Sequence, residues 1–153
     1  MAGNGSPTAT PTPWYRGACH ELEPRGVPAA PANLTNESVV PFLEAYANAS
    51  HWNEQFAGEA YARAEVDTNG FVVTRTETGY IVHVGRQVST LSCDGVHGDP
   101  SRFGHGYDYF INESVLAVTD TGVGVRNASV HPAVSVAEIL RNGTVVERWN
   151  RTR

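Results

Sequence analysis

In SVVPFLEAYANASHWNEQFAG, Ser38–Gly58, the apolar residues recur at the spacing of an α-helix, and this is the clearest structural signal in the chain. One face of such a helix would carry Val39, Leu43 and Tyr46. Ser38 is a suitable N-cap, because Pro41 then falls in the first turn, where its missing N–H is harmless. We therefore predict a helix of about 20 residues that ends near Gly58.

Beyond this helix the apolar residues alternate with polar ones, which is the spacing of β-strands. Residues 71–77 and 80–91 flank a short Thr78-Gly79 turn and indicate a hairpin, and residues 107–111 and 115–119 form a second hairpin around Asn112. A third hairpin is predicted where residues 134–140 and 145–149 flank Asn142-Gly143, a strong turn signal. The glycine-rich segment 94–106 reads as a long loop.

A helix followed by hairpins is typical of an α+β domain. We expect one long N-terminal helix packed on an antiparallel sheet of five or six strands. At 153 residues the chain is long enough for one ordinary domain, which we assign to residues 17–153. Residues 1–16 are rich in Pro and Thr and are predicted to be a flexible spacer.

Asparagines occur in this chain almost exclusively within Asn-x-Ser/Thr triplets. Eight of the ten asparagines do so, far more than a random sequence of this composition would give. They are Asn4, Asn33, Asn36, Asn48, Asn112, Asn127, Asn142 and Asn150. Such triplets are acceptors of N-linked glycans on exported proteins, so we predict glycosylation at the domain's own positions, Asn33 to Asn150, and an extracytoplasmic location.

The two cysteines, Cys19 and Cys93, agree with that location. An even number of cysteines in an oxidising compartment predicts a disulfide, and two free buried thiols are the alternative. Their wide separation, without a C-x-x-C pair, is a poor pattern for a metal site.

Charge and hydropathy restrict the partners. The net charge of −5 argues against binding nucleic acid through a basic surface. All eleven basic residues are Arg, which either reflects codon bias or serves anion binding. No apolar stretch is long enough to span a membrane, and no cofactor motif is present.

The start of the chain lacks a signal peptide, since it has neither a basic start nor an apolar run. A Pro/Thr-rich spacer at a mature N-terminus is typical of a lipid-anchored surface protein, whose anchor cysteine would lie upstream of Ala2. Any membrane attachment would therefore be through that anchor. An unmodified secreted protein is the alternative.

Metal-ligating residue types are concentrated between Cys93 and Asp108. The weak candidates are His97, Asp99, His105 and Asp108, since imidazole and carboxylate both bind first-row metals. Their spacing matches no known pattern, and a solvated polar loop is the simpler interpretation, so no metal site is assigned.

Other titratable residues have ordinary interpretations. His83 fits a buried histidine of a strand, His51 a helix-end residue, and His131-Pro132 a turn before a strand. No Ser/His/Asp grouping is visible, so no catalytic residue is assigned. The aromatic residues, among them Trp52, Tyr107 and Tyr109, are expected to form the core, and a ligand pocket lined by a few of them is the alternative.

Three segments carry a resemblance to known proteins. FLEAY at residues 42–46, TRTETGY at 74–80 and YFINES at 109–114 resemble a group of uncharacterised haloarchaeal cell-surface lipoproteins, over residues 31–149. This resemblance implies an extracytoplasmic location and a disulfide, and it brings no catalytic residues.

The order of elements is also similar to that of cystatin-like and NTF2-like folds, in which a curved sheet wraps around one helix. Cystatin inhibitors use a Gln-x-Val-x-Gly hairpin tip, whereas Gln87–Leu91 here lacks both the spaced valine and the glycine. In NTF2-like folds a cone opens near the helix, where Glu44, Glu54 and Glu59 would lie. Both likenesses are analogies of topology and carry little functional weight.

Together these patterns predict a non-enzymatic, glycosylated surface domain with an interaction or structural role and an unknown surface partner. Two alternatives remain open. One is a small-ligand-binding module of the NTF2-like type, and the other is metal binding at residues 93–108.

Overall fold

The computed structural model describes residues 19–95, 97–98, 104–123 and 131–149, with backbone alone at residues 97, 98 and 123. The elements in chain order are β2 (His20–Glu21), α2 (Asn36–Gln55), β3 (Ala60–Tyr61), β4 (Arg63–Arg75), β5 (Tyr80–Leu91), β6 (His97–Gly98), β7 (His105–Ile111), β8 (Val115–Val123), α3 (Val136–Asn142) and β9 (Thr144–Arg148). The predicted spacer, Asn4, Asp99, Asn127 and Asn150 lie outside the described residues.

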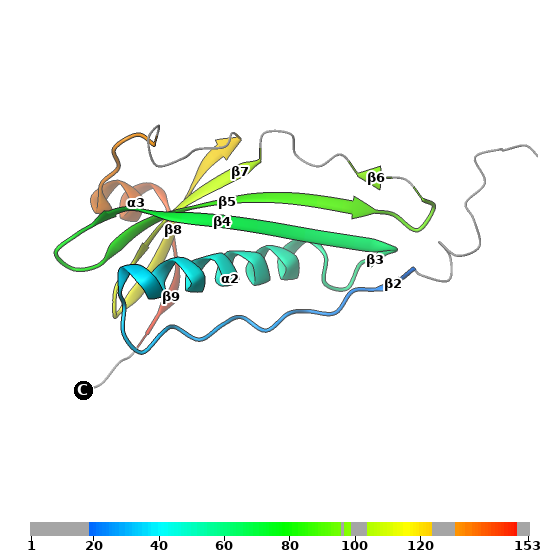
Figure 1. The fold of residues 1–153 in the computed structure, drawn as a ribbon, viewed down its shortest axis with the longest axis horizontal. Coiled ribbons are helices and arrows are strands. Elements are labelled where there is room, and N and C mark those ends of the chain that lie inside the picture. The colour runs from blue at the N-terminus through cyan, green and yellow to red at the C-terminus, as the bar shows by residue number, and fades with distance from the viewer. Residues whose placement is uncertain (1–18, 96, 99–103, 124–130, 150–153) are drawn as a thin grey trace, which may run out of the picture.

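The α+β class and the antiparallel sheet are confirmed (Figure 1). The sheet has the strand order β4-β5-β7-β8-β9, and the two-residue β6 pairs with β5. All of its pairings are antiparallel. The first two predicted hairpins are present as β4–β5 and β7–β8.

Helix α2 begins earlier than its apolar spacing predicts. Its N-cap is Thr35, whose hydroxyl accepts from the backbone N–H of Ser38 at 3.0 Å. In return the Ser38 hydroxyl accepts from the backbone N–H of Thr35 at 2.9 Å. This reciprocal capping box, rather than a cap at Ser38, starts the helix. The helix extends over 20 residues, as expected, and ends at Gln55.

A second helix, α3, replaces the third predicted hairpin. Ser135 caps it by accepting from the backbone N–H of Glu138 at 3.1 Å, and the Glu138 carboxylate lies 3.3 Å from the backbone nitrogen of Ser135. Gly143 follows as the C-cap, so Asn142-Gly143 ends a helix instead of turning a hairpin. The prediction of a single helix is therefore wrong.

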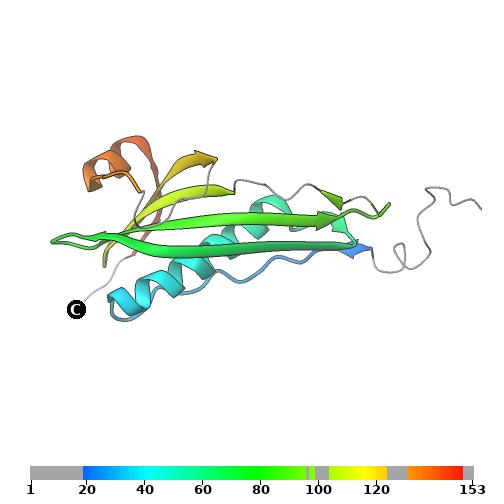
Figure 2. The same ribbon diagram turned by 45° about the horizontal axis from the view of Figure 1, so that its top comes forward.

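The two helices cover opposite faces of the sheet (Figures 1 and 2). Alternate residues of each strand point to opposite faces, so even-numbered β5 residues such as Val82 and Val84 pack under α2. Ile81 of β5 and Phe110 of β7 instead pack with Ile139 of α3. Each face of the sheet thus has its own apolar core.

The segment before α2 runs alongside that helix (Figure 1). The Trp52 indole N–H donates to the carbonyl of Glu23 at 2.7 Å, and the Arg25 guanidinium lies 3.5 Å from the centroid of the Trp52 ring. At the start of this segment a disulfide joins Cys19 to Cys93, with 5.3 Å between the Cα atoms. The predicted disulfide is confirmed, and it ties the segment to the end of β5.

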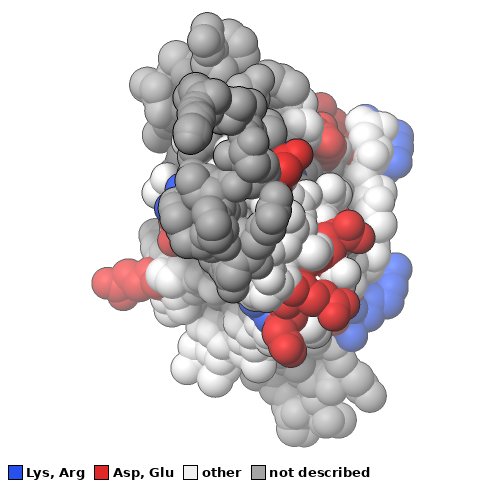
Figure 3. Space-filling view, turned by 90° about the vertical axis from the view of Figure 1, so that its right-hand side faces the viewer, with Lys and Arg blue, Asp and Glu red and all other residues white. Residues whose placement is uncertain are grey.

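The end of the molecule at which α2 stops is seen in Figure 3. On the described part of this face, acidic side chains gather near the middle and basic side chains lie along an edge. No continuous basic field of the kind that binds nucleic-acid backbones is seen there. Neither α2 nor α3, the helices of the described chain, is both long and apolar enough to cross a lipid bilayer.

Candidate functional site

A pocket of about 200 Å³ opens between the C-terminal half of α2 and the sheet. Its lining comes from one face of α2 and from the α2-facing residues of four strands. These residues are Tyr46, Ala47, Ser50, His51 and Glu54 of α2, Arg86 of β5, Tyr107 and Tyr109 of β7, Val118 of β8 and Val146 of β9. The pocket lies where the apolar core under α2 gives way to polar side chains.

The strand pattern explains why a charged residue lines this pocket. Tyr80, Val82 and Val84 face α2 and are buried, and the next residue of the same parity is Arg86. On β7, His105 pairs with Arg86 and Tyr107 pairs with Val84, so Tyr107 is the diagonal neighbour of Arg86 on the same face. The geometry of the sheet therefore places a guanidinium and a phenol at the end of the core.

Arg86 is held by two neutral hydrogen-bonding groups. One guanidinium nitrogen donates to the Tyr107 hydroxyl at 2.8 Å and lies 2.6 Å from Nδ1 of His51. A guanidinium can only donate, so His51 Nδ1 must be the acceptor. No carboxylate of the described residues forms an ion pair with Arg86, and its buried Nε has no hydrogen-bond partner among them.

The histidine and the three tyrosines that line the pocket have pKa values shifted toward their neutral forms. Burial, followed by the neighbouring Arg86 cation and His105, lowers the pKa of His51 to about 4. Burial also raises the pKa of the Tyr46, Tyr107 and Tyr109 hydroxyls above the ordinary value. At neutral pH the pocket therefore presents a cationic guanidinium among uncharged donors and acceptors, with Glu54 exposed at its side.

This arrangement is suited to binding a small anion. A partly buried guanidinium such as that of Arg86 is unfavourable when no carboxylate pairs with it. The carboxylate of a ligand would supply such a partner through a charge-assisted hydrogen bond. The apolar Ala47, Val118 and Val146 would contact the rest of an organic ligand. The pocket has the mixed character of small-molecule sites, although it is smaller than most of them.

The histidines and carboxylates of the predicted loop do not form one site. Nε2 of His105 lies 2.7 Å from Asp120, whereas Asp108 contacts His83 and His131. Burial tends to raise the pKa of Asp108, but the hydrogen bonds to those two imidazoles outweigh it and hold the pKa below the ordinary value. The side chains of His97 and Asp99 are outside the described part of the chain.

The three helix carboxylates considered from sequence have different surroundings. Glu54 lines the pocket. Glu44 accepts from the backbone N–H of Gly70 at 2.8 Å and so helps to fix α2 to β4. Glu59 is exposed beyond the end of the helix. One of the three thus reaches the candidate site.

The triplet asparagines differ in exposure. Asn33, Asn36 and Asn142 are exposed. Asn112 is half-buried at the β7–β8 turn, where its Oδ1 accepts from the backbone N–H groups of Ser114 and Val115. Asn48 is half-buried as well, and its Nδ2, the atom to which a glycan would be joined, donates to the carbonyl of Val66 at 2.6 Å.

Arg86 and His51 were not identified as a pair from the sequence. The contact joins residues 35 positions apart, so it depends on how α2 lies across the sheet. One local signal was available: in Tyr80–Arg86 the core-facing apolar alternation is interrupted by a charged residue, which marks the end of a core or the wall of a pocket. No protein-family model, curated protein or solved structure matches this chain.

Proposed function

We propose that this chain is an exported surface domain that binds a small organic anion in the pocket between α2 and the sheet. The observation that carries the proposal is the guanidinium of Arg86, half-buried beside neutral His51 and Tyr107 and without a carboxylate partner among the described residues. A carboxylate ligand would accept from this guanidinium in a charge-assisted hydrogen bond.

The extracytoplasmic part of the proposal rests on two independent features. The Cys19–Cys93 disulfide is typical of proteins that leave the cytoplasm. The eight Asn-x-Ser/Thr triplets are typical of chains that carry N-linked glycans. Both features support the proposal of export. The resemblance of residues 31–149 to haloarchaeal cell-surface lipoproteins adds the proposal that a lipid attaches the domain to the cell surface.

Nuclear magnetic resonance titration of the full chain with matched ligands tests the anion site. Benzoate and benzamide have nearly the same shape but differ in charge. We expect benzoate to shift the resonances of Arg86 and Tyr107 and to bind about tenfold or more tightly than benzamide, because the hydrogen bond to a charged group is worth about 1.5–3 kcal/mol. Succinate and acetate extend the panel to aliphatic carboxylates.

Two variants separate this pocket from general charge effects. Arg86→Gln keeps a hydrogen-bond donor but removes the charge, and it should abolish the preference for benzoate. Arg148→Gln removes an exposed charge of β9 that does not line the pocket, and it should leave that preference intact. If the folded chain binds none of the carboxylates at about 10 mM, the proposal fails, and an interaction or structural role is the better assignment.

A further inference from the structure

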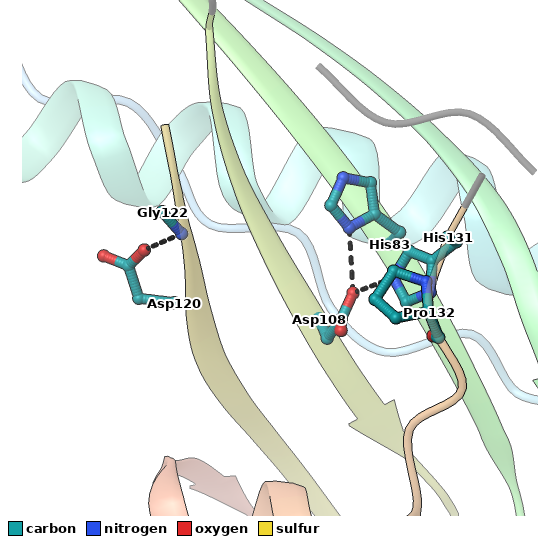
Figure 4. Close-up of polar contacts among 6 residues, drawn as sticks. All are labelled: His83, Asp108, Asp120, Gly122, His131 and Pro132. Carbon is teal, nitrogen blue, oxygen red and sulfur yellow. Dashed lines mark hydrogen bonds and ion pairs between the residues drawn. The ribbon is translucent and has the colours of Figure 1, made fainter. Parts of the chain in front are cut away.

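On the face of the sheet opposite the pocket, His83, Asp108 and His131 meet in a buried cluster (Figure 4). His83 and Asp108 are cross-strand partners on β5 and β7, so their side chains emerge side by side. His131 comes from the segment that leads into α3. Their side chains are 2%, 5% and 2% exposed, respectively, so their present polar contacts are with one another and with the surrounding chain.

Both imidazoles approach the same carboxylate oxygen. His83 Nδ1 and His131 Nε2 each lie 2.8 Å from Oδ1 of Asp108. One potential ligand atom from each residue lies within 4.8 Å of the other two. Bonds of about 2.0–2.2 Å to a central cation would require only modest movements of these side chains.

The hydrogen bonding of His131 indicates what the cluster accommodates. Its Nδ1 lies 2.7 Å from the carbonyl oxygen of Pro132, which can only accept, so Nδ1 carries a proton. In a neutral ring Nε2 is then a lone pair facing the lone pairs of the Asp108 carboxylate. Either a second proton or a metal cation must lie between these two atoms.

The contact between His131 and Pro132 also has the form that metal-binding histidines adopt. A ligating imidazole commonly donates its other N–H to a backbone carbonyl, and this bond orients the ring toward the metal. Here it directs Nε2 of His131 to the Asp108 oxygen that His83 also contacts (Figure 4). The contact with the Pro132 carbonyl thus orients the His131 ring without any help from His83 or Asp108.

His83 is held in place from its other side. A methyl group at Gly106 would lie 2.7 Å from its Cε1, so the ring rests directly over that glycine. Its Nε2 is buried and has no hydrogen-bond partner among the described residues. A buried nitrogen without a hydrogen-bond partner is unfavourable. The polar contact that the His83 ring does make is the one from Nδ1 to Asp108.

We propose that His83, Asp108 and His131 bind one divalent first-row transition metal ion, of which Zn²⁺ is the representative probe. Two imidazoles and a carboxylate are donors for such ions, whereas Ca²⁺ and Mg²⁺ prefer oxygen ligands alone. A groove lined by residues 71–74 and 131–134 borders His131 and would admit water to a fourth position. The bound ion would fasten the start of the α3 segment to β5 and β7.

Metal binding by the untagged full chain tests this site. After treatment with a chelator and dialysis, we expect the chain to take up one Zn²⁺ or Co²⁺ per molecule and to unfold at a higher temperature with the metal. The Co²⁺ form should show visible absorption bands, and the imidazole resonances of His83 and His131 should shift or broaden. A folded chain that takes up no stoichiometric metal would overturn the proposal and leave a hydrogen-bonded cluster.

Matched variants locate the bound ion. Asp108→Asn and His131→Gln keep side chains of similar size, and each should weaken Zn²⁺ binding by about 100-fold or more. His105→Gln changes a histidine that pairs with Asp120 outside the cluster, and it should bind Zn²⁺ as the parent chain does. Unchanged binding by both cluster variants would place the ion elsewhere and refute the assignment.

If the cluster variants do not fold, the imidazole resonances of the parent chain show whether the metal ion binds at this cluster. Selective effects of Co²⁺ on His83 and His131 would support the site, and effects confined to other histidines would reject it. None of these results depends on the anion pocket, which lies on the other face of the sheet.

Discussion

His51 and Arg86 form a contact in which one side chain keeps the other neutral. The guanidinium lies 2.6 Å from His51 Nδ1, and burial together with this cation lowers the pKa of His51 to about 4. An uncharged imidazole can accept from Arg86, whereas an imidazolium would repel it. The stability of the fold at acidic pH should therefore depend on His51.

We predict that the free energy of unfolding falls as the pH is lowered from about 6.5 to about 4. In this range the unfolded chain protonates His51, at its ordinary pKa near 6.5, and the folded chain does not. Allowing for solvent screening of a half-buried ring, the contribution of His51 is about 1–2 kcal/mol. Urea denaturation at several pH values measures it.

His51→Gln should lose this part of the pH dependence, and His20→Gln, a change at an exposed histidine of β2, should retain it. An identical pH profile for the parent chain and His51→Gln would show that another group is responsible.

Helix α3 packs on the sheet chiefly through one fully buried side chain, Ile139. It has seven residues, and among its residues Ile139 is the buried one. That side chain is fully buried against Ile81, Phe110 and Ala117, whereas its neighbour Leu140 is 46% exposed. A helix this short gains little from its own hydrogen bonds and is stabilised by packing.

Ile139→Ala should lower the free energy of unfolding by about 2–4 kcal/mol, because it removes buried methyl groups and leaves a cavity. Leu140→Ala, the matched change one residue away, should alter it by no more than about 0.5 kcal/mol. Chemical denaturation of the two variants gives both values. Equal losses would contradict the packing of α3 through Ile139.

For the molecule as a whole, the proposed location on a cell surface has consequences for its covalent state. The disulfide links residues 74 positions apart and holds the segment before α2 to the end of β5. The triplet asparagines lie in distinct environments, from exposed to half-buried. A glycan needs space around the asparagine nitrogen, so the fold discriminates among these positions.

We predict that protein purified from its native host carries glycans at exposed Asn33, Asn36 and Asn142 and none at Asn48. The Asn48 nitrogen is committed to the Val66 carbonyl, and its oxygen accepts from Arg25 at 2.7 Å. Peptide mapping by mass spectrometry, before and after deglycosylation and reduction, measures occupancy and the disulfide together. A glycan on Asn48, or a chain free of glycans throughout, would contradict this prediction.

The features that could be predicted from the sequence are those that depend on neighbours along the chain. The helical spacing of Val39, Leu43 and Tyr46 predicted α2, and alternation on each side of Thr78-Gly79 and Asn112 predicted the two hairpins. These patterns are local because the periods of a helix and a strand are properties of the backbone.

Helix α3 and the two candidate sites, by contrast, could be identified only from the folded structure. Residues 134–140 suit a strand or a helix, and the Ser135–Glu138 capping box with the burial of Ile139 selects the helix. Asp108 meets His83 and His131 across separations of 25 and 23 residues, and Arg86 meets His51 across 35. Such contacts depend on strand register and on the position of α2, which arise from packing over the whole domain and leave no periodic trace in the sequence.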